Sequence, residues 1–354
     1  MTSLSRWSVA LGAALCLSAC HSPQTKNDPP AGPGSEEASP AGVPRMATSS
    51  PLPSRRFRVR YQVDLEGLKP GKQVRLWIPL PTDDPHQKIS EVSVKAPWQE
   101  ARTRESAWGN TMLFFEGEAE AAKAQVVVNY TVLRHENRAN PARLQGPGRS
   151  SASLFAKSLR ASSLVKVNAK IRGEAAKLSA GRQGTLAVAR AFYDHVQKQM
   201  AYDKSGEGWG QGDSAYACSV GKGNCTDYHA YFMALCLAAK IPARFQIGLY
   251  GPYALKPGKS VQTGGYHCWA EFHVPGGGWV PVDISEGDKH PERGDYFFGA
   301  HTPNRVTLST GRDLVLSPPQ RGAPLNYFVN PYAELEGKAV SARKSVRWTE
   351  LSAR

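Results

Sequence analysis

The chain has 354 residues, which is long for a single compact core and favours two domains with extensions. Hydrophobic residues make up 41% of the chain and charged residues 21%, a balance typical of globular proteins. The net charge is +14, but the basic residues are spread out rather than clustered, which favours a solvated basic surface and argues against a nucleic-acid site.

The first 20 residues have the pattern of an export signal. Arg6 supplies a positive charge, and the apolar run over 7–17 is too short to span a bilayer. The run ends in LSAC at positions 17–20, and small residues before a cysteine resemble the lipobox of bacterial lipoproteins. This resemblance implies that 1–19 is a lipoprotein signal peptide and that Cys20 is lipidated. The alternative is a plain secretory signal with an incidental cysteine.

Residues 20–54 are rich in Pro, Ser, Gly and Ala and show no apolar period. Such a segment cannot bury enough surface to fold, so we predict a flexible tether. Residue 21 is His rather than Asp, the usual inner-membrane retention signal of Gram-negative lipoproteins. We therefore expect an extracytoplasmic protein that is anchored by lipid to a bacterial membrane, the outer membrane if the cell is Gram-negative.

Residues 55–135 alternate in the manner of β-strands. Five segments place β-branched or aromatic residues at every second position, with Gly, Pro, Asp or Asn between the segments. They are RRFRVRYQVDL, KQVRLWIPL, KISEVSVKA, NTMLFFEGE and AQVVVNYTVLRHE. The pattern predicts a small antiparallel β-sandwich with a scaffold or recognition role.

A polar segment with Gly and Pro, 136–163, is predicted to be a connector. Two stretches with helical patterns follow, at 164–180 and 184–200. Residues 204–224 are rich in Gly, Ser and Asp and predict a long loop, and long loops are often functional.

The stretch GKGNCTDYHAYFMALC, residues 221–236, places a cysteine at a predicted helix start. Asn224 is a good N-cap for a helix that begins at Cys225 and runs to about Lys240, before Pro242. A thiol is a useful nucleophile only as the thiolate, and its pKa falls at a helix N-terminus and beside an imidazolium. The sequence therefore favours a reactive thiolate at Cys225 over a buried structural thiol.

A predicted hairpin downstream supplies an imidazole and a carboxylate. Its strands, YHCWAEFHV and GWVPVDIS, flank a glycine-rich turn. If His273 pairs with Trp279 across this turn, Asp283 pairs with Trp269, and a register slip of one residue would abolish the arrangement.

His267 shares a strand face with Trp269 because side chains alternate, and so becomes a diagonal neighbour of Asp283. A base and its orienting carboxylate need this geometry, and a helix carrying Cys225 on the same face would complete a triad. Cys268 lies on the opposite face of the strand, and we expect it to point away from the triad.

The order cysteine, histidine, aspartate within GKGNCTDYHAYFMALCLAAKIPARF, GYHCWAEFHV and GWVPVDIS resembles the core of the transglutaminase-like superfamily. The resemblance implies an α+β fold, with a papain-like catalytic domain over 164–335 in which the cysteine helix packs on an antiparallel sheet. It implies Cys225 as nucleophile, His267 as general acid and base, and Asp283 as its orienter. The strand-rich segment resembles the β-domain of bacterial members, and 336–354 is expected to be a C-terminal tail.

One oxyanion donor is expected to be the backbone N–H of Cys225. By the resemblance, a second donor precedes the cysteine, and Trp209 and Tyr216 are the candidates. Asp227 and His229, on the first turns of the helix, are expected to be capping or partly buried polar residues, with a supporting role in the site as the alternative.

The remaining cysteines are not expected to form a disulfide scaffold. Cys236 falls three turns after the nucleophile and is expected to be buried, whereas the state of Cys218 stays open. The spacing of the Cys and His residues does not match that of zinc ligands, and no acidic calcium loop is found, so no cofactor is expected.

These residues indicate a thiol enzyme that attacks an amide carbonyl and forms an acyl-enzyme. By the resemblance, many bacterial members are peptidases or amidases. We therefore expect hydrolysis of a peptide, isopeptide or amide bond in a peptide or protein of the cell envelope. Cross-linking as a protein-glutamine γ-glutamyltransferase is one alternative, and a catalytically inactive binding module of the envelope is the other.

Overall fold

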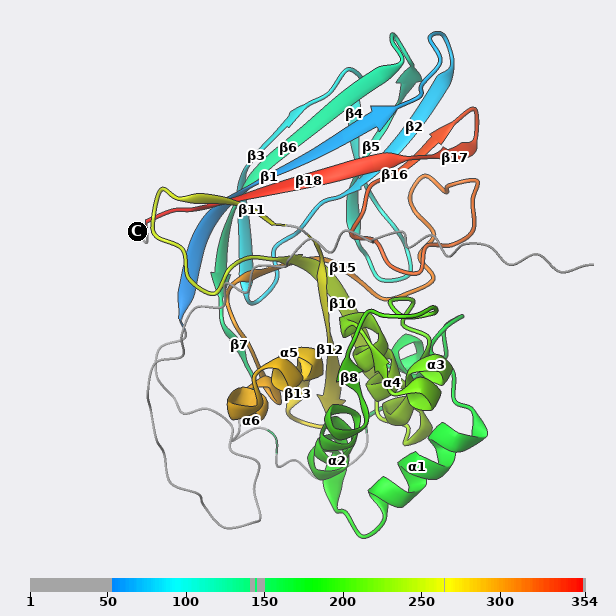
Figure 1. Cartoon of the computed structure of the whole chain (residues 1–354), viewed down its shortest axis with the longest axis vertical. Coiled ribbons are helices and arrows are strands. Elements are labelled where there is room, and N and C mark those ends of the chain that lie inside the picture. Colours follow the sequence, from blue (N-terminus) through cyan, green and yellow to red (C-terminus); the bar gives the residue numbers. More distant parts are fainter. Residues whose placement is uncertain (1–52, 141–143, 145–149, 264, 353–354) are drawn as a thin grey trace, which may run out of the picture. The chain divides into compact units, whose positions relative to one another are not determined.

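The computed structural model describes residues 53–140, 144, 150–263 and 265–352, all within one compact unit (Figure 1). The expected signal peptide, Cys20 and nearly all of the expected tether lie outside these residues. The fold is α+β, as predicted, with sheets that are almost entirely antiparallel. Within the described residues, no helix is both long enough and apolar enough to cross a bilayer.

Two five-stranded sheets form the part of the molecule at the top of Figure 1. The first has the order β11 (Ser260–Thr263), β18 (Ala342–Glu350), β1 (Ser54–Glu66), β6 (Lys123–His135) and β3 (Gln87–Lys95). The second has the order β17 (Lys338–Val340), β16 (Tyr332–Leu335), β2 (Gln73–Pro79), β5 (Thr111–Glu118) and β4 (Glu100–Arg104). All five predicted strands are confirmed.

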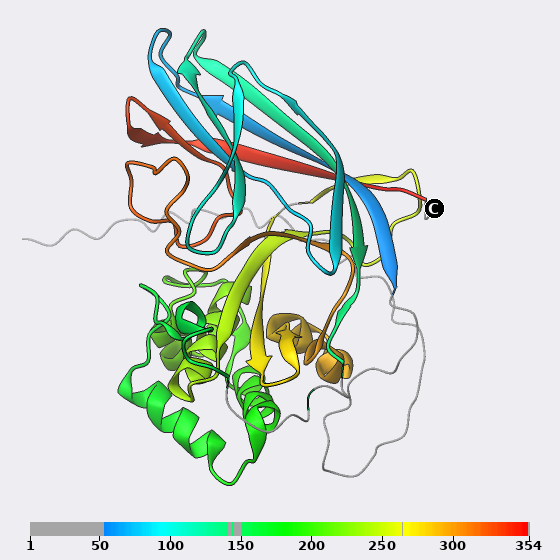
Figure 2. The same ribbon diagram turned by 180° about the vertical axis from the view of Figure 1, so that it is seen from behind.

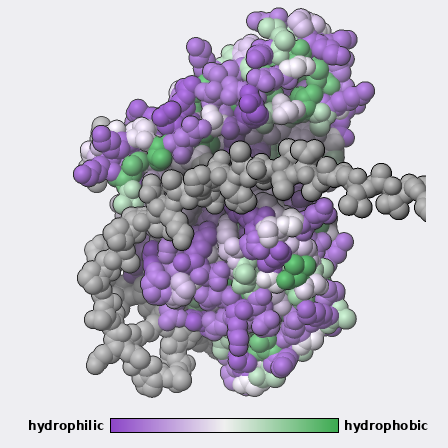
Figure 3. Space-filling model, in the orientation of Figure 1, coloured by the Kyte–Doolittle hydropathy of each residue, from purple (hydrophilic) through white to green (hydrophobic). Residues whose placement is uncertain are grey.

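Alternation along the strands explains how these two sheets bury their inner faces. In β1, for example, Val59 and Tyr61 are buried whereas Arg58 and Arg60 are exposed. The surface over this part of the molecule is largely hydrophilic in Figure 3, as outward charged side chains require.

The C-terminal segment is not a tail, and that prediction is wrong. Strand β18 lies between β1 and β11 and pairs with β1 along its whole length. Val346 and Trp348 of β18 are buried, and Trp348 stacks on Phe57 with ring centroids 3.5 Å apart. The C-terminal strands therefore complete a sheet that the N-terminal segment begins.

The segment predicted to be catalytic contains a four-stranded sheet with helices against it. The strand order is β13 (Gly278–Val282), β12 (His267–Val274), β10 (Ala243–Tyr250) and β15 (Arg305–Thr310). The helices are α1 (Ala169–Ser179), α2 (Gly184–Gln199), α3 (Ser214–Val220), α4 (Cys225–Ala238), α5 (Ile284–Lys289) and α6 (Gly294–Phe297). The remaining described elements are short. Two are 3-10 turns, η2 (Ala156–Leu159) and η3 (Pro291–Arg293). The others are two-residue strands that pair as β7 (Asn137–Arg138) with β14 (Ala300–His301) and as β8 (Ala201–Tyr202) with β9 (Lys222–Gly223).

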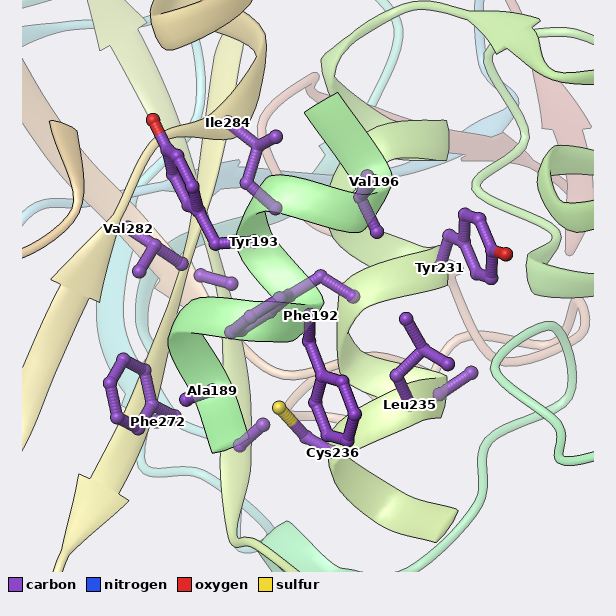
Figure 4. Close-up of a cluster of buried hydrophobic side chains, with 14 of the residues drawn as sticks. Ala189, Phe192, Tyr193, Val196, Tyr231, Leu235, Cys236, Phe272, Val282 and Ile284 are labelled. Atoms are coloured by element: carbon purple, nitrogen blue, oxygen red, sulfur yellow. The ribbon is translucent and has the colours of Figure 1, made fainter. Parts of the chain in front are cut away.

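Helix α4 runs through the core of this segment and is buried on nearly every side, as a helix without a polar face must be. Figure 4 shows its residues Leu235 and Cys236 against Phe192 of α2. The expected burial of Cys236 is confirmed, because its side chain is fully enclosed. The first residue of α4, Cys225, is therefore carried by one of the best-packed elements of the fold.

The sandwich and the catalytic sheet share one apolar cluster. It joins inward residues of β1 and β2 to Phe245 and Ile247 of β10 and to Cys225 itself. A pair of hydrogen bonds joins Gln87 to the backbone of Thr307, at 3.1 Å and 3.0 Å. Strand β15 runs beside the sandwich, as the opposite views in Figures 1 and 2 both show. The β-domain and the segment predicted to be catalytic therefore belong to one compact unit.

Candidate active site

Cys225 is held at the N-terminus of α4 by a capping box. The Asn224 side chain accepts a 2.9 Å hydrogen bond from the N–H of Thr226, and Asp227 accepts one of 2.9 Å from the N–H of Asn224. The predicted N-cap is confirmed. As the first N–H of the helix, that of Cys225 has no partner inside α4, and it lies at the positive end of the helix dipole.

Asp227 also ties the preceding loop to the helix start. Its fully buried carboxylate accepts hydrogen bonds from the N–H groups of Gly210, at 2.7 Å, and Gly212, at 2.9 Å. The capping role expected for Asp227 is confirmed. The loop expected over 204–224 contains the short helix α3, which the sequence analysis missed.

The hairpin of β12 and β13 has the predicted register. His273 pairs with Trp279, and Ala270 pairs with Val282. The next position along the hairpin is that of Asp283, and its carboxylate accepts a 2.7 Å hydrogen bond from Nε2 of His267. The expected proximity of this imidazole and carboxylate is therefore present.

Helix α4 packs on the face of β12 that is opposite to the predicted one. Phe232 of α4 packs against Phe272, with centroids 6.1 Å apart, and Phe272 shares a strand face with Cys268, not with His267. His267 is the first residue of β12, so its ring reaches the Cys225 thiol at the end of the strand and forms a hydrogen bond with it. The three predicted residues meet although one step of the prediction was wrong.

Cys268 does not point away from the site, and that prediction is also wrong. Its sulfur lies 3.5 Å from Nδ1 of His229 and is hydrogen-bonded to the thiol of Cys225. The side chains alternate along β12 as expected, but the nucleophile approaches on the face that was thought to be remote. A second thiol is therefore in direct contact with the first.

The surroundings favour a thiolate at Cys225. The hydrogen bond from Cys268 holds the pKa of the Cys225 thiol well below its usual range, and the hydrogen bond and charge of His267 act in the same direction against the effect of burial. Burial alone would lower the pKa of His267, but the charge of Asp283 and its hydrogen bond raise it to about 9. Cys225 and His267 are therefore set up as a thiolate–imidazolium pair.

Arg305 belongs to the candidate site, and the sequence analysis missed it. It comes from β15, is fully buried, and donates a 3.0 Å hydrogen bond to the same oxygen of Asp283 that binds His267. Burial by itself would raise the pKa of Asp283, but the charges of His267 and Arg305 hold it well below its usual range. Arg305 therefore keeps the orienting carboxylate ionised.

His229 connects the backbone of Cys225 to that of Ile284, the residue after Asp283. Its Nδ1 lies 2.7 Å from the carbonyl oxygen of Cys225, and its Nε2 accepts a 3.1 Å hydrogen bond from the N–H of Ile284. Burial lowers the pKa of His229, which favours the neutral ring with its proton on Nδ1. His229 is fully rather than partly buried, and it supports the site by fixing Cys225 relative to the residue after Asp283.

The two expected oxyanion donors lie in different surroundings. The ring of Tyr216 packs under Gly208, where a Cβ would be 2.9 Å from it, and its hydroxyl is buried without a hydrogen-bond partner in the described part of the chain. Trp209 is half-buried in the loop that Asp227 anchors. Neither has a hydrogen bond to the nucleophile among the described residues, and their expected role stays a prediction.

A layer of polar and aromatic side chains supports His267. The Tyr250 ring lies 4.6 Å from the His267 ring, and the Tyr250 hydroxyl donates a 2.9 Å hydrogen bond to Glu286, which also accepts one of 2.8 Å from Lys289. Among the described residues, no three His, Cys, Asp or Glu side chains are grouped so as to hold a metal ion. Cys218 is a free thiol that contacts Glu174 at 3.5 Å, remote from this cluster.

A helix with a cysteine at its start, packed on an antiparallel sheet that carries a His–Asp pair, defines a papain-like fold. Residues 172–284, which include all three side chains, match the family model of the transglutaminase-like superfamily. The chain therefore carries a transglutaminase-like core.

Comparison with known proteins agrees with this fold. An uncharacterised protein of Haemophilus influenzae is 28% identical over 308 residues, covering 76% of this chain and 83% of that protein. The crystal structure of a candidate cysteine protease from Cytophaga hutchinsonii, 16% identical, aligns with a TM-score of 0.55 over 85% of this chain and 92% of that one. The periplasmic domain of TgpA from Pseudomonas aeruginosa, 18% identical, aligns over 68% of this chain and 90% of that one, but its TM-score of 0.36 supports no conclusion.

Proposed function

We propose that the protein is a thiol acyl-transfer enzyme that hydrolyses a peptide, isopeptide or amide bond. The observation that carries this proposal is the buried chain of contacts from Cys225 through His267 to Asp283 and Arg305. A structural cysteine needs neither an imidazole with a raised pKa nor a buried ion pair behind it. The same set of groups is what activation of a sulfur nucleophile requires.

In the first half-reaction, the Cys225 thiolate attacks the substrate carbonyl. The oxyanion that forms lies at the start of α4, where the N–H of Cys225 and the helix dipole stabilise it. Nε2 of His267 is hydrogen-bonded to the Asp283 carboxylate, so Nδ1 is the nitrogen that gives its proton to the departing amine. The products of this step are a thioester on Cys225 and a free amine.

In the second half-reaction, neutral His267 removes a proton from water as the water attacks the thioester. The carboxylic acid leaves, and the thiolate–imidazolium pair is restored. An amine in place of water would give transfer instead, so the acceptor decides between hydrolysis and cross-linking.

The expected position of the enzyme is extracytoplasmic, with a lipid on Cys20. The LSAC sequence at 17–20 and the short apolar run before it support this proposal. Mass spectrometry of the N-terminal peptide of the membrane-extracted protein is the test. An acylated Cys20 is the expected result, and an unmodified Cys20 behind an intact residue 1 would contradict it.

The proposed activity is tested with a library of labelled peptides that contain peptide and isopeptide bonds. We expect cleavage by the wild-type protein and loss of at least about a thousandfold in Cys225→Ala, since nucleophile and base act as a unit. A labelled primary amine offered with a glutamine-containing protein separates the two outcomes. Amine incorporation without cleavage would replace hydrolysis by cross-linking, and a cellular role that survives Cys225→Ala would favour a binding module.

A further inference from the structure

The active site contains two thiols rather than one. Cys225 is 2% exposed and Cys268 fully buried, and their sulfur atoms are joined by a hydrogen bond. His229 fixes the pair from one side, because its ring contacts both the carbonyl oxygen of Cys225, at 2.7 Å, and the sulfur of Cys268, at 3.5 Å. The two thiols come from different elements, α4 and β12, whose packing holds them together.

The other two described cysteines are not placed in this way. Cys218 of α3 contacts Glu174 of α1 at 3.5 Å, and Cys236 is enclosed by apolar side chains in Figure 4. The proton transfers of the hydrolytic cycle need only His267 and its carboxylate, so Cys268 contributes to the cycle only through its hydrogen bond to Cys225. The Cys268 thiol is therefore left unchanged by each turn of the reaction.

We propose that Cys225 and Cys268 form a reversible disulfide that blocks the nucleophile and is opened by a thiol reductant. This inference rests on the proposed function, in which Cys225 is the nucleophile. The partner reagent is a disulfide of general form RSSR, either a small molecule or a thiol–disulfide exchange protein. Disulfides persist outside the cytoplasm, which is the location that the proposed export signal implies for the chain.

The chemistry proceeds by two exchange steps. The Cys225 thiolate attacks one sulfur of RSSR, an S–S bond forms to Cys225, and the RS⁻ that leaves takes the proton of the His267 imidazolium. The sulfur of Cys268 then attacks the Cys225 sulfur, and the second RS⁻ takes the proton that Cys268 gives up. Two thiols are oxidised, RSSR is reduced to two RSH, and a thiol reductant reverses both steps.

The arrangement of the two thiols can protect Cys225 from irreversible oxidation. A low-pKa thiolate beside a resolving cysteine is the usual composition of a redox-sensitive site. Without Cys268, the first exchange step would stop at a mixed disulfide, and stronger oxidants would carry Cys225 to irreversible acids. With Cys268 in contact, the intramolecular bond forms first and can be reduced.

The test is peptide mapping of the full-length protein, purified with reductant and then exposed to 2-hydroxyethyl disulfide. Trypsin places Cys225 on peptide 223–240 and Cys268 on peptide 260–289. We expect these two peptides to be cross-linked, with fragmentation that assigns the bond to Cys225 rather than to Cys236. Iodoacetamide labelling of Cys225 should fall by more than about tenfold, because the thiolate is the species that reacts, and should return with dithiothreitol.

Two variants make the result specific. In Cys268→Ser, Cys225 should stop at the mixed disulfide with 2-mercaptoethanol, whereas Cys218→Ser should cross-link like the wild type. A wild-type protein that stays free or stops at the mixed disulfide would overturn the proposal, as would a bond between Cys268 and Cys236. Because the cross-link is read by mass, it is independent of peptide hydrolysis by the reduced protein, and the two proposals fail separately.

Discussion

At the scale of the residue, Arg305 determines the charge of the site. Among the described residues, replacing Arg305 by Met should leave His267 as the one buried cationic hydrogen-bond partner of Asp283, and breaking a buried ion pair costs about 3–5 kcal/mol. We expect a loss of that size in the free energy of unfolding by urea. Arg60→Met, at an exposed position, is the matched control and should change stability little. Equal effects of the two substitutions would show that the ion pair of Arg305 with Asp283 does not stabilise the fold.

The pH dependence of the activity follows from the ionisation of Cys225 and His267. The thiolate of Cys225 is lost as the pH falls through its lowered pKa, and the proton of His267 is lost as the pH rises through about 9. The value of kcat/KM should therefore be flat between these limits and decline on the alkaline side near pH 9. His267→Ala should bring the pKa of Cys225, measured by alkylation rate, back toward about 8.5. An unperturbed Cys225 in the wild type would contradict the ion pair.

The neighbouring thiol gives a separate prediction. Cys268→Ala removes the hydrogen bond that contributes most to the lowered pKa of Cys225, so the alkylation profile should move to higher pH. Cys268→Ser keeps a donor at the same position and should preserve most of the shift. If Ala and Ser gave the same profile, the hydrogen bond would not be the cause.

The site could be predicted from sequence only where it depends on local geometry. The pairing of His267 with Asp283 follows from a turn and a period of two, both of which are readable in the chain. The face of β12 that α4 covers depends on packing between distant segments, so Cys268 was misplaced. Arg305 was missed because a single arginine in a strand does not reveal which buried carboxylate it meets.

At the scale of the element, α3 shows where periodicity fails. Its seven residues are too few to display a helical stripe, although Asp213 caps its start and Gly221 ends it in a left-handed conformation with φ of 70°. Both residues are recognisable helix-boundary signals. The long helices were predictable because their apolar patterns extend over several turns.

The start of α4 offers a test at this scale. Asp227→Asn leaves one carbonyl oxygen to accept the N–H groups of Gly210, Gly212 and Asn224, so at least one buried donor loses its partner. An unsatisfied buried donor costs about 1–3 kcal/mol, and the loop should become sensitive to proteolysis. Asp213→Asn is the matched control, because asparagine is equally good as an N-cap. Equal melting temperatures for the two variants would argue that Asp227 does not hold the loop.

At the scale of the whole molecule, the C-terminal strand unites the fold. Trp348 is fully buried in the cluster that also contains Cys225 and the catalytic strands. Trp348→Ala should therefore cost about 3–5 kcal/mol, although it lies in the last segment of the chain. Because the cluster is shared, tryptophan fluorescence and exposure of Cys225 to alkylation should report one unfolding transition in urea, in both proteins. Arg347→Ala, on the outward face of β18, should leave the midpoint unchanged. Two separate transitions would show that the sandwich and the catalytic sheet unfold independently, and the sandwich would then be an appended domain rather than part of the site's support.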